Sequence, residues 1–181
     1  MTSCRSKKAA RGFSLIEVLV TLLIVSFGLL GVSKMQAAAL SNTQIARARS
    51  LIALQAGSLA SAMHGNRGFW AKGLAPDKIS IKGATVTDSK GVLTSTADCV
   101  AKVCTPAELA AYDVQAWARN MQIRFPGYEA NIECTTTVGV PVDCFIELTW
   151  AERYVAINRS TASAAGAKQT ATQQFSLMVQ P

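Results

Sequence analysis

The sequence has very little of what catalytic and metal sites usually need. Its 181 residues include a single histidine, His64, so a site built on several histidines, such as an HExxH zinc centre, is excluded. No glycine-rich Walker or Rossmann pattern occurs, and a Ser-His-Asp arrangement would depend on that one histidine. Charged residues make up only 16% of the chain, while half of it is apolar. We therefore expect an ordered protein that is not an enzyme and that uses no metal or cofactor.

Acidic residues are missing from the start of the chain. Four basic residues stand there before the first acid, and they are Arg5, Lys7, Lys8 and Arg11. Without these four, the formal charge of +7 falls to +3. The other basic residues are scattered along the chain and do not form a cluster interleaved with aromatic residues. This distribution disfavours nucleic acid as a partner.

A long apolar run follows the basic residues. Residues 18–33 carry no charge, and residues 13–32 as a helix would be about 30 Å long, the thickness of a hydrocarbon core. An ordinary secretory signal has a shorter apolar region of about 7–15 residues. The run therefore predicts a membrane helix, with the basic residues cytoplasmic and everything after Lys34 on the far side. Glu17 lies near its start, where a deeply placed carboxylate costs about 2.5–3.5 kcal/mol.

The segment around Glu17 resembles the class III signal of type IV pilins. Residues 7–17 read KKAARGFSLIE, with Gly12 before the cleavage point, Phe13 after it and Glu17 fifth in the mature chain. The resemblance implies that a prepilin peptidase removes residues 1–12, N-methylates Phe13 and leaves the helix in place. It also implies that Glu17 pairs with the N-terminal amine of a neighbouring subunit, which would relieve a buried charge. A plain membrane anchor whose Glu17 reaches the interface is the alternative.

Beyond the membrane the helix is expected to continue. Residues 34–64 lack proline, and Ile45, Ile52 and Leu59 recur every seven residues as an apolar stripe for a sheet to cover. Gly65-Asn66 supplies a stop signal. The predicted organisation is a leader (residues 1–12), a transmembrane helix (13–33), its amphipathic continuation (34–65) and a periplasmic globular head (66–181). The fold class is α+β and type IV pilin-like, with the long helix packed on a small antiparallel sheet.

Residues 65–106 are rich in glycine and predict mainly loops, with strand-like alternation only at residues 79–81 and 84–87. Phe69-Trp70 is the one aromatic pair in this region. An exposed pair would offer a contact for a partner subunit, whereas a pair packed against the helix would be core. Core is the favoured interpretation.

A second helix is predicted from Thr105-Pro106-Ala107-Glu108, a capping box with proline at the first helical position, to about Met121. Strands are expected at residues 130–136, 142–150 and 173–179, with a long loop at 158–172. The extra helix makes the chain similar to the PilV-type minor pilins. That finer resemblance is carried by Asp113, Trp117, Pro126-Gly127 and Trp150.

Of the five cysteines, Cys4 lies in the leader, so cleavage would leave an even number. The favoured pairing joins Cys134 to Cys144 across a hairpin and Cys99 to Cys104 ahead of the second helix, and the two other pairings are possible. Metal binding by the four thiols is the rival, but their spacing differs from that of paired CxxC knuckles.

These features predict a minor pilin that helps to prime assembly of a type IV pilus. The resemblance implies as partners the prepilin peptidase, other minor pilins, the major pilin, the inner-membrane assembly platform and a possible tip adhesin. The protein would lie in the inner membrane and then in the pilus. A pseudopilin of type II secretion is one alternative, and an adhesive or DNA-binding minor pilin is the other.

Overall fold

The computed structural model describes residues 12–135, 137, 140–153 and 170–181. The chain separates into two compact units, one ending at Leu40 and the other, called the head unit here, spanning Ser41–Pro181. The elements are α1 (Leu15–Gly65), β1 (Lys78–Lys82), β2 (Thr85–Asp88), the 3-10 turn η1 (Val92–Thr94), α2 (Pro106–Arg124), β3 (Glu129–Cys134), β4 (Cys144–Arg153) and β5 (Thr170–Val179). The predicted leader, apart from Gly12, and residues 158–169 of the predicted loop lie outside the described residues.

The long helix α1 forms as its sequence predicts and ends at Gly65. The backbone N–H of Asn66 donates to the carbonyls of Ala62 and Met63, both at 3.2 Å, which closes the last turn. The Asn66 side chain donates to the Pro106 carbonyl at 2.7 Å. The end of α1 is therefore tied directly to the start of α2.

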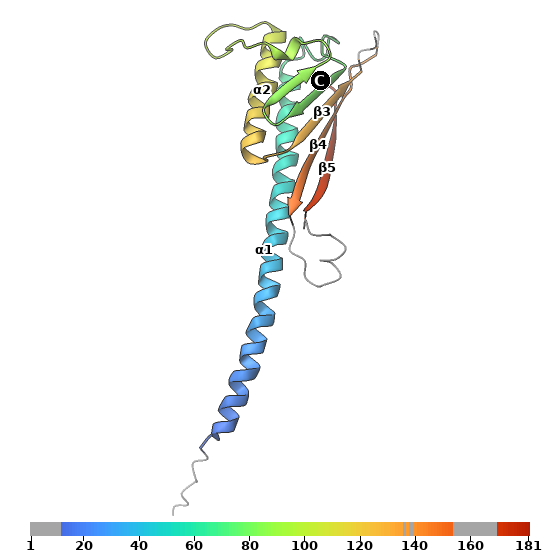
Figure 1. Cartoon of the computed structure of the whole chain (residues 1–181). Helices are drawn as coiled ribbons and strands as arrows, with labels where there is room; N and C mark the ends of the chain where they lie inside the picture. Colours follow the sequence, from blue (N-terminus) through green and yellow to red (C-terminus); the bar gives the residue numbers. More distant parts are fainter. Residues whose placement is uncertain (1–11, 136, 138–139, 154–169) are drawn as a thin grey trace, which may run out of the picture. The chain divides into compact units, whose positions relative to one another are not determined.

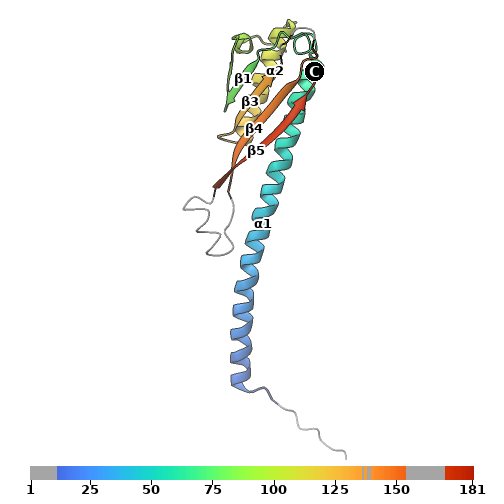
Figure 2. The same cartoon turned by 90° about the vertical axis from the view of Figure 1, so that its right-hand side faces the viewer.

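Five strands form one antiparallel sheet in the order β2-β1-β3-β4-β5. Figure 2 shows β1, β3, β4 and β5 side by side in this order. A two-residue connection joins β1 to β2, and Gly83 at its first position has a φ of 60°, which glycine adopts without strain. The chain then passes through η1 and α2 before β3 returns beside β1, which places α2 over the sheet (Figure 1).

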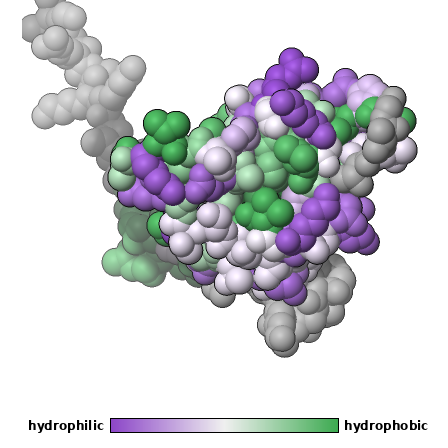
Figure 3. Space-filling view, turned by 90° about the horizontal axis from the view of Figure 1, so that it is seen from above, coloured by the Kyte–Doolittle hydropathy of each residue, from purple (hydrophilic) through white to green (hydrophobic). Residues whose placement is uncertain are grey.

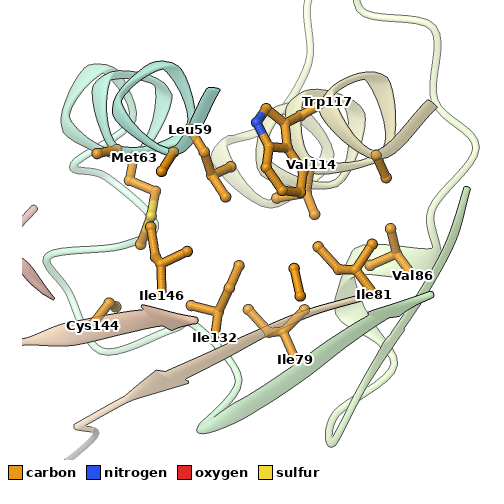
Figure 4. Close-up of a cluster of buried hydrophobic side chains, with 14 of the residues drawn as sticks. Leu59, Met63, Ile79, Ile81, Val86, Val114, Trp117, Ile132, Cys144 and Ile146 are labelled. Atoms are coloured by element: carbon orange, nitrogen blue, oxygen red, sulfur yellow. The ribbon is translucent and has the colours of Figure 1, made fainter. Parts of the chain in front are cut away.

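The core lies between one face of the sheet and the two helices. Figure 4 shows Leu59 and Met63 of α1, and Val114 and Trp117 of α2, facing the strand residues. The strand side chains labelled there are Ile79, Ile81, Val86, Ile132, Cys144 and Ile146, and all are buried. The alternation of each strand thus sends every second side chain inward, and the helices supply the apolar cover that the sheet needs.

The outer face of the sheet carries charged side chains where β1 and β3 lie side by side. Lys78 pairs with Glu133 at 3.6 Å, and Lys82 pairs with Glu129 at 3.4 Å, each pair lying across β1 and β3. These side chains are largely exposed, so each ion pair contributes little to stability. Their exposure shows that this part of the outer face is in contact with water.

The α+β, type IV pilin-like layout is confirmed, while several boundaries differ from the predictions. Residues 170–172 were expected in a loop but belong to β5, where they pair with residues 151–153 of β4. Partner backbone groups supply this pairing, and the local Ser, Thr and Ala composition does not reveal it. Helix α2 extends to Arg124 rather than Met121, and η1 was not predicted.

Candidate functional site

The start of α1 is the first part of the candidate site. Gly12, Phe13 and Ser14 precede the helix, and the Ser14 carbonyl accepts from the Glu17 N–H at 3.0 Å and the Val18 N–H at 3.3 Å. A Cβ added at Gly12 would meet no described atom within 4 Å. Nothing in the described fold therefore requires glycine at position 12, and a requirement for it would come from an enzyme that reads this segment.

The apolar part of α1 is exposed on all sides. Its Leu, Ile, Val and Phe side chains from Phe13 to Val32 are between 46% and 84% exposed. By length and composition α1 is able to cross a membrane. So much apolar surface is unfavourable in water. The segment needs lipid or the helices of other subunits to cover it.

The hydroxyl groups in this part of α1 are already satisfied within the helix. Thr21 donates to the Val18 carbonyl at 2.9 Å, Ser26 to the Leu22 carbonyl at 2.7 Å and Ser33 to the Leu29 carbonyl at 2.8 Å. Polar groups need such internal partners in a hydrocarbon core. These three residues are therefore compatible with a lipid environment.

Glu17 is different, because it makes no ion pair or side-chain hydrogen bond with any residue that the structure describes. Its place in the first turn of α1 is favourable for a carboxylate, since the backbone N–H groups give this helix end a partial positive charge. That effect is smaller than the cost of holding a charge in lipid. Among the described residues, Glu17 therefore has no cation that compensates its charge.

The head unit is joined to its part of α1 by a buried carboxylate. Arg49 on α1 donates from Nε to Glu152 Oε1 at 3.0 Å and from Nη2 to Oε2 at 2.8 Å, and Trp150 Nε1 donates to Oε1 at 3.0 Å. Glu152 is 7% exposed. The hydrogen bonds from Arg49 hold the pKa of Glu152 below its usual range of about 4.5. The cluster fixes α1 against the end of β4.

The sequence offered a signal for this cluster that our predictions did not use. Cys144, Ile146, Leu148, Trp150 and Glu152 are alternate residues of β4 and all are buried. A charged residue in the inward register of a strand needs a partner of opposite charge. The identity of that partner, Arg49, lies 103 positions away and could not be read from the sequence.

The capping box at the start of α2 is confirmed. The Glu108 N–H donates to Thr105 Oγ1 at 3.3 Å, and the Thr105 N–H donates to Glu108 Oε2 at 2.9 Å. The bond from the Thr105 backbone, followed by those from the Lys102 and Thr105 side chains, lowers the pKa of Glu108 to about 2. The start of α2 is therefore fixed by local interactions.

The two predicted cysteine pairs come together. Cys99 and Cys104 are bonded just before α2, with 5.5 Å between their Cα atoms, and Cys134 and Cys144 are bonded across β3 and β4, with 4.0 Å between theirs. Among the described residues there is no group of His, Cys, Asp or Glu side chains arranged to hold a metal ion. Disulfide formation, rather than thiolate binding of a metal, is what this geometry supports.

The proposed partner contact at Phe69 and Trp70 is not found at the surface. The two residues are 1% and 2% exposed, and their rings meet edge to face at a centroid distance of 5.2 Å. The core alternative is therefore the one observed. Both side chains belong to the hydrophobic core, together with Leu59 and Met63 of α1.

The residues that carried the finer resemblance are structural in this chain. Trp117 is buried and donates to the Gln55 carbonyl at 2.9 Å, Trp150 holds Glu152, and Gly127 has a φ of 81° in the turn after α2. Burial raises the pKa of Asp113. These contacts explain the residues through packing and do not identify a subtype.

The head unit also exposes apolar side chains. Seen from above, one face of the molecule carries apolar side chains at its centre with hydrophilic ones around them (Figure 3). The exposed apolar residues in the loops of the head unit include Leu74, Val100 and Val103. Phe69 and Trp70, the aromatic pair predicted as a possible partner contact, are not among these exposed residues.

Comparison with known protein families gives a match at the start of the chain. The family model described as the prokaryotic N-terminal methylation motif matches residues 7–33. It supports a prepilin signal of the type IV pilin kind, and it covers three of the four basic residues (Lys7, Lys8 and Arg11) together with Gly12, Phe13, Glu17 and the apolar run. No curated protein and no solved structure matches the chain. The head unit is therefore understood from its own residues.

Proposed function

We propose that this chain is a minor pilin of a type IV pilus, cleaved between Gly12 and Phe13 and active in priming pilus assembly. The observation that carries the proposal is a prepilin-type signal that leads directly into an exposed apolar segment, residues 13–33, whose sole charged side chain is Glu17. In this proposal the chain is anchored in the inner membrane before assembly, with its head in the periplasm. It then enters the base or tip of the pilus with other minor pilins and the major pilin.

Cleavage creates the partner that Glu17 lacks. Removal of residues 1–12 leaves a new amine on Phe13, and an α-amino group with a usual pKa of about 7.7–8.0 is largely cationic at neutral pH. When subunits bundle, the amine of one chain meets Glu17 of another, and both charges are compensated in the apolar environment. Uncut chains carry no such amine and would bundle poorly.

A pseudopilin of type II secretion is the second candidate, because the N-terminal signal and helix would serve it equally well. The head unit favours the pilus, because it contains the second helix α2 and two disulfides in addition to α1 and the sheet. The adhesive or DNA-binding alternative loses its proposed contact, because Phe69 and Trp70 are buried. We therefore rank the adhesive or DNA-binding function below the minor pilin and the pseudopilin.

Mass spectrometry of sheared surface filaments tests the proposal. We expect the N-terminal peptide of this chain to begin at Phe13 and to carry an added methyl group. Processed protein found solely in membranes would favour the pseudopilin. A chain that still begins at Met1 would contradict both candidates and leave a plain anchored domain.

A further inference from the structure

The two edges of the sheet are protected very differently. The edge strand β2 has four residues and packs against η1 and α2, and the Asp88 carboxylate accepts from the N–H groups of Val92 and Leu93. The opposite edge, β5, has ten residues and pairs only with β4 among the described strands (Figure 2). A long unpaired edge is a ready template for another strand.

The sequence of β5 contains none of the usual devices that prevent such pairing. It reads TATQQFSLMV, without a charged residue, proline or glycine. Natural edge strands are commonly blocked by lysine, proline or a bulge. The charged pairs on the outer face of this sheet lie on β1 and β3 instead. Met178, near the end of β5, is 71% exposed.

The hydrogen-bond register shows which backbone groups of β5 face outward. Thr135 N–H donates to the Asp143 carbonyl at 2.8 Å, so the next pair, Cys134 and Cys144, is a non-hydrogen-bonded pair of β3 and β4. The backbone groups of Cys144 therefore point toward β5, where Cys144 pairs with Val179. By alternation, five residues of β5 direct their N–H and C=O groups to the open edge: Thr170, Thr172, Gln174, Ser176 and Met178.

We propose that β5 is the docking edge for an extended, uncharged strand of a separate polypeptide that runs antiparallel to it. The free ladder groups specify a strand, because only extended backbone offers donors and acceptors at the same spacing. Phe175 and Leu177 are partly buried and pack against the core at this edge. Apolar side chains at alternate positions of the incoming strand would cover them. β5 has no charged residue that could pair with a charge on the incoming strand, so an uncharged strand fits it best.

The direction of α1 argues that the incoming strand belongs to a different protein. Arg49 meets Glu152, and Met63 lies beside Ile146 (Figure 4), so the head part of α1 runs antiparallel to β4 and parallel to β5. An antiparallel pair of two β5 strands, the favourable ladder for identical edges, would reverse one copy relative to the other. In an assembly whose heads all point the same way, as the proposed function requires, two copies cannot meet in that way.

Amide hydrogen exchange on the full chain tests the inference. In the purified protein in detergent, the amides of the outward residues, such as Gln174 and Ser176, should exchange freely, while those of Phe175 and Leu177 are protected. In sheared filaments or membrane assemblies, the outward amides should become protected by about tenfold or more, with little change at the inward ones. Unchanged exchange at the outward amides would overturn the inference.

A matched pair of variants tests the same edge. Ser176→Pro removes an outward N–H while keeping the ladder with β4, and Ser176→Ala alters the side chain but keeps the amide. We expect the proline variant to fold but to lose the protection and to be depleted several-fold from assemblies, whereas the alanine variant behaves as wild type. Equal incorporation of the two variants would refute the edge contact. Protection that rises with concentration in the purified chain alone would refute a separate polypeptide and indicate a second copy.

The inference rests on the chain entering an assembly, as proposed above, and the two failures can be distinguished. Methylated Phe13 in filaments together with unprotected outward amides would contradict the β5 contact alone. An uncut N-terminus would contradict the proposed function whatever the exchange shows.

Discussion

Replacing Arg49 with alanine should loosen the attachment of the head to α1. The change leaves Glu152, which is 7% exposed, with the Trp150 N–H as its remaining side-chain partner among the described residues. An unpaired buried polar group costs about 1–3 kcal/mol, and more when it is charged. The Arg49 side chain is 54% exposed, so water can enter and replace part of the lost hydrogen bonding to Glu152. We therefore expect the cost of about 1–3 kcal/mol, rather than the larger cost of a fully buried charge. At about 4 °C per kcal/mol, the melting temperature should fall by about 4–12 °C.

Near-UV circular dichroism of the full-length chain in detergent measures this change. The signal reports on the head unit, because all three tryptophans, Trp70, Trp117 and Trp150, lie in it. Arg47→Ala is the matched control: it removes the same charge from the same helix, and Arg47 is exposed and forms no ion pair within the described part of the chain. The control should melt as wild type.

The effect should also depend on pH. Arg49 lowers the pKa of Glu152 in the folded protein relative to about 4.5 in the unfolded chain. A carboxyl group with a lowered folded pKa stabilises the fold above its unfolded pKa, and this contribution is lost as pH falls through the folded pKa. The difference between Arg49→Ala and wild type should therefore be largest near neutral pH and shrink below about pH 4.5. Equal melting of Arg49→Ala and Arg47→Ala at pH 7, or a difference that stays constant to pH 3, would refute the reasoning.

Three further changes test other parts of the chain. Glu17→Ala should leave cleavage intact, because the cut precedes it, but should lower N-methylation or incorporation into filaments; normal filaments containing the variant would contradict the pairing with the Phe13 amine. Replacing Cys134 and Cys144 with serine should destabilise the head by about 2–4 kcal/mol, measured by denaturant unfolding. Trp70→Ala should cost about 3–5 kcal/mol through a core cavity, so the loss should appear in the melting temperature of the purified chain before any partner is added.

The parts of the fold that follow local rules were predictable. The capping box of Thr105 and Glu108, the stop at Gly65 and the alternation in β3 each depend on residues a few positions apart, and each is found in the structure. The Cys134–Cys144 bond was predictable because both residues flank one hairpin. Within the candidate site, the signal around Gly12 and Phe13 is contiguous and was recognised from the residues alone.

What the sequence did not reveal depends on residues far apart in the chain. The partner of Glu152 is on α1, and the first three residues of β5 are strand because residues 151–153 pair with them. The loop was predicted because residues 158–172 form a Ser, Thr and Ala tract with Gly166 and little apolar content. Whether Phe69 and Trp70 are buried or exposed likewise depends on whether the core beside the end of α1 has space for two rings. Tertiary packing decides this, and the local sequence does not reveal it.

The two units of the chain differ in how their polar and apolar groups are accommodated. The polar groups of the head unit are largely satisfied internally: Glu152 by Arg49 and Trp150, and Tyr128, whose pKa burial raises, through contacts with the carbonyls of Gly83 and Ala118. The first part of α1 is instead exposed and apolar, and its carboxylate, Glu17, forms no ion pair with any residue described in the structure. Because the needs of the two units differ, damage to the head should first reduce stability, whereas damage at Glu17 should reduce assembly of a head that remains folded.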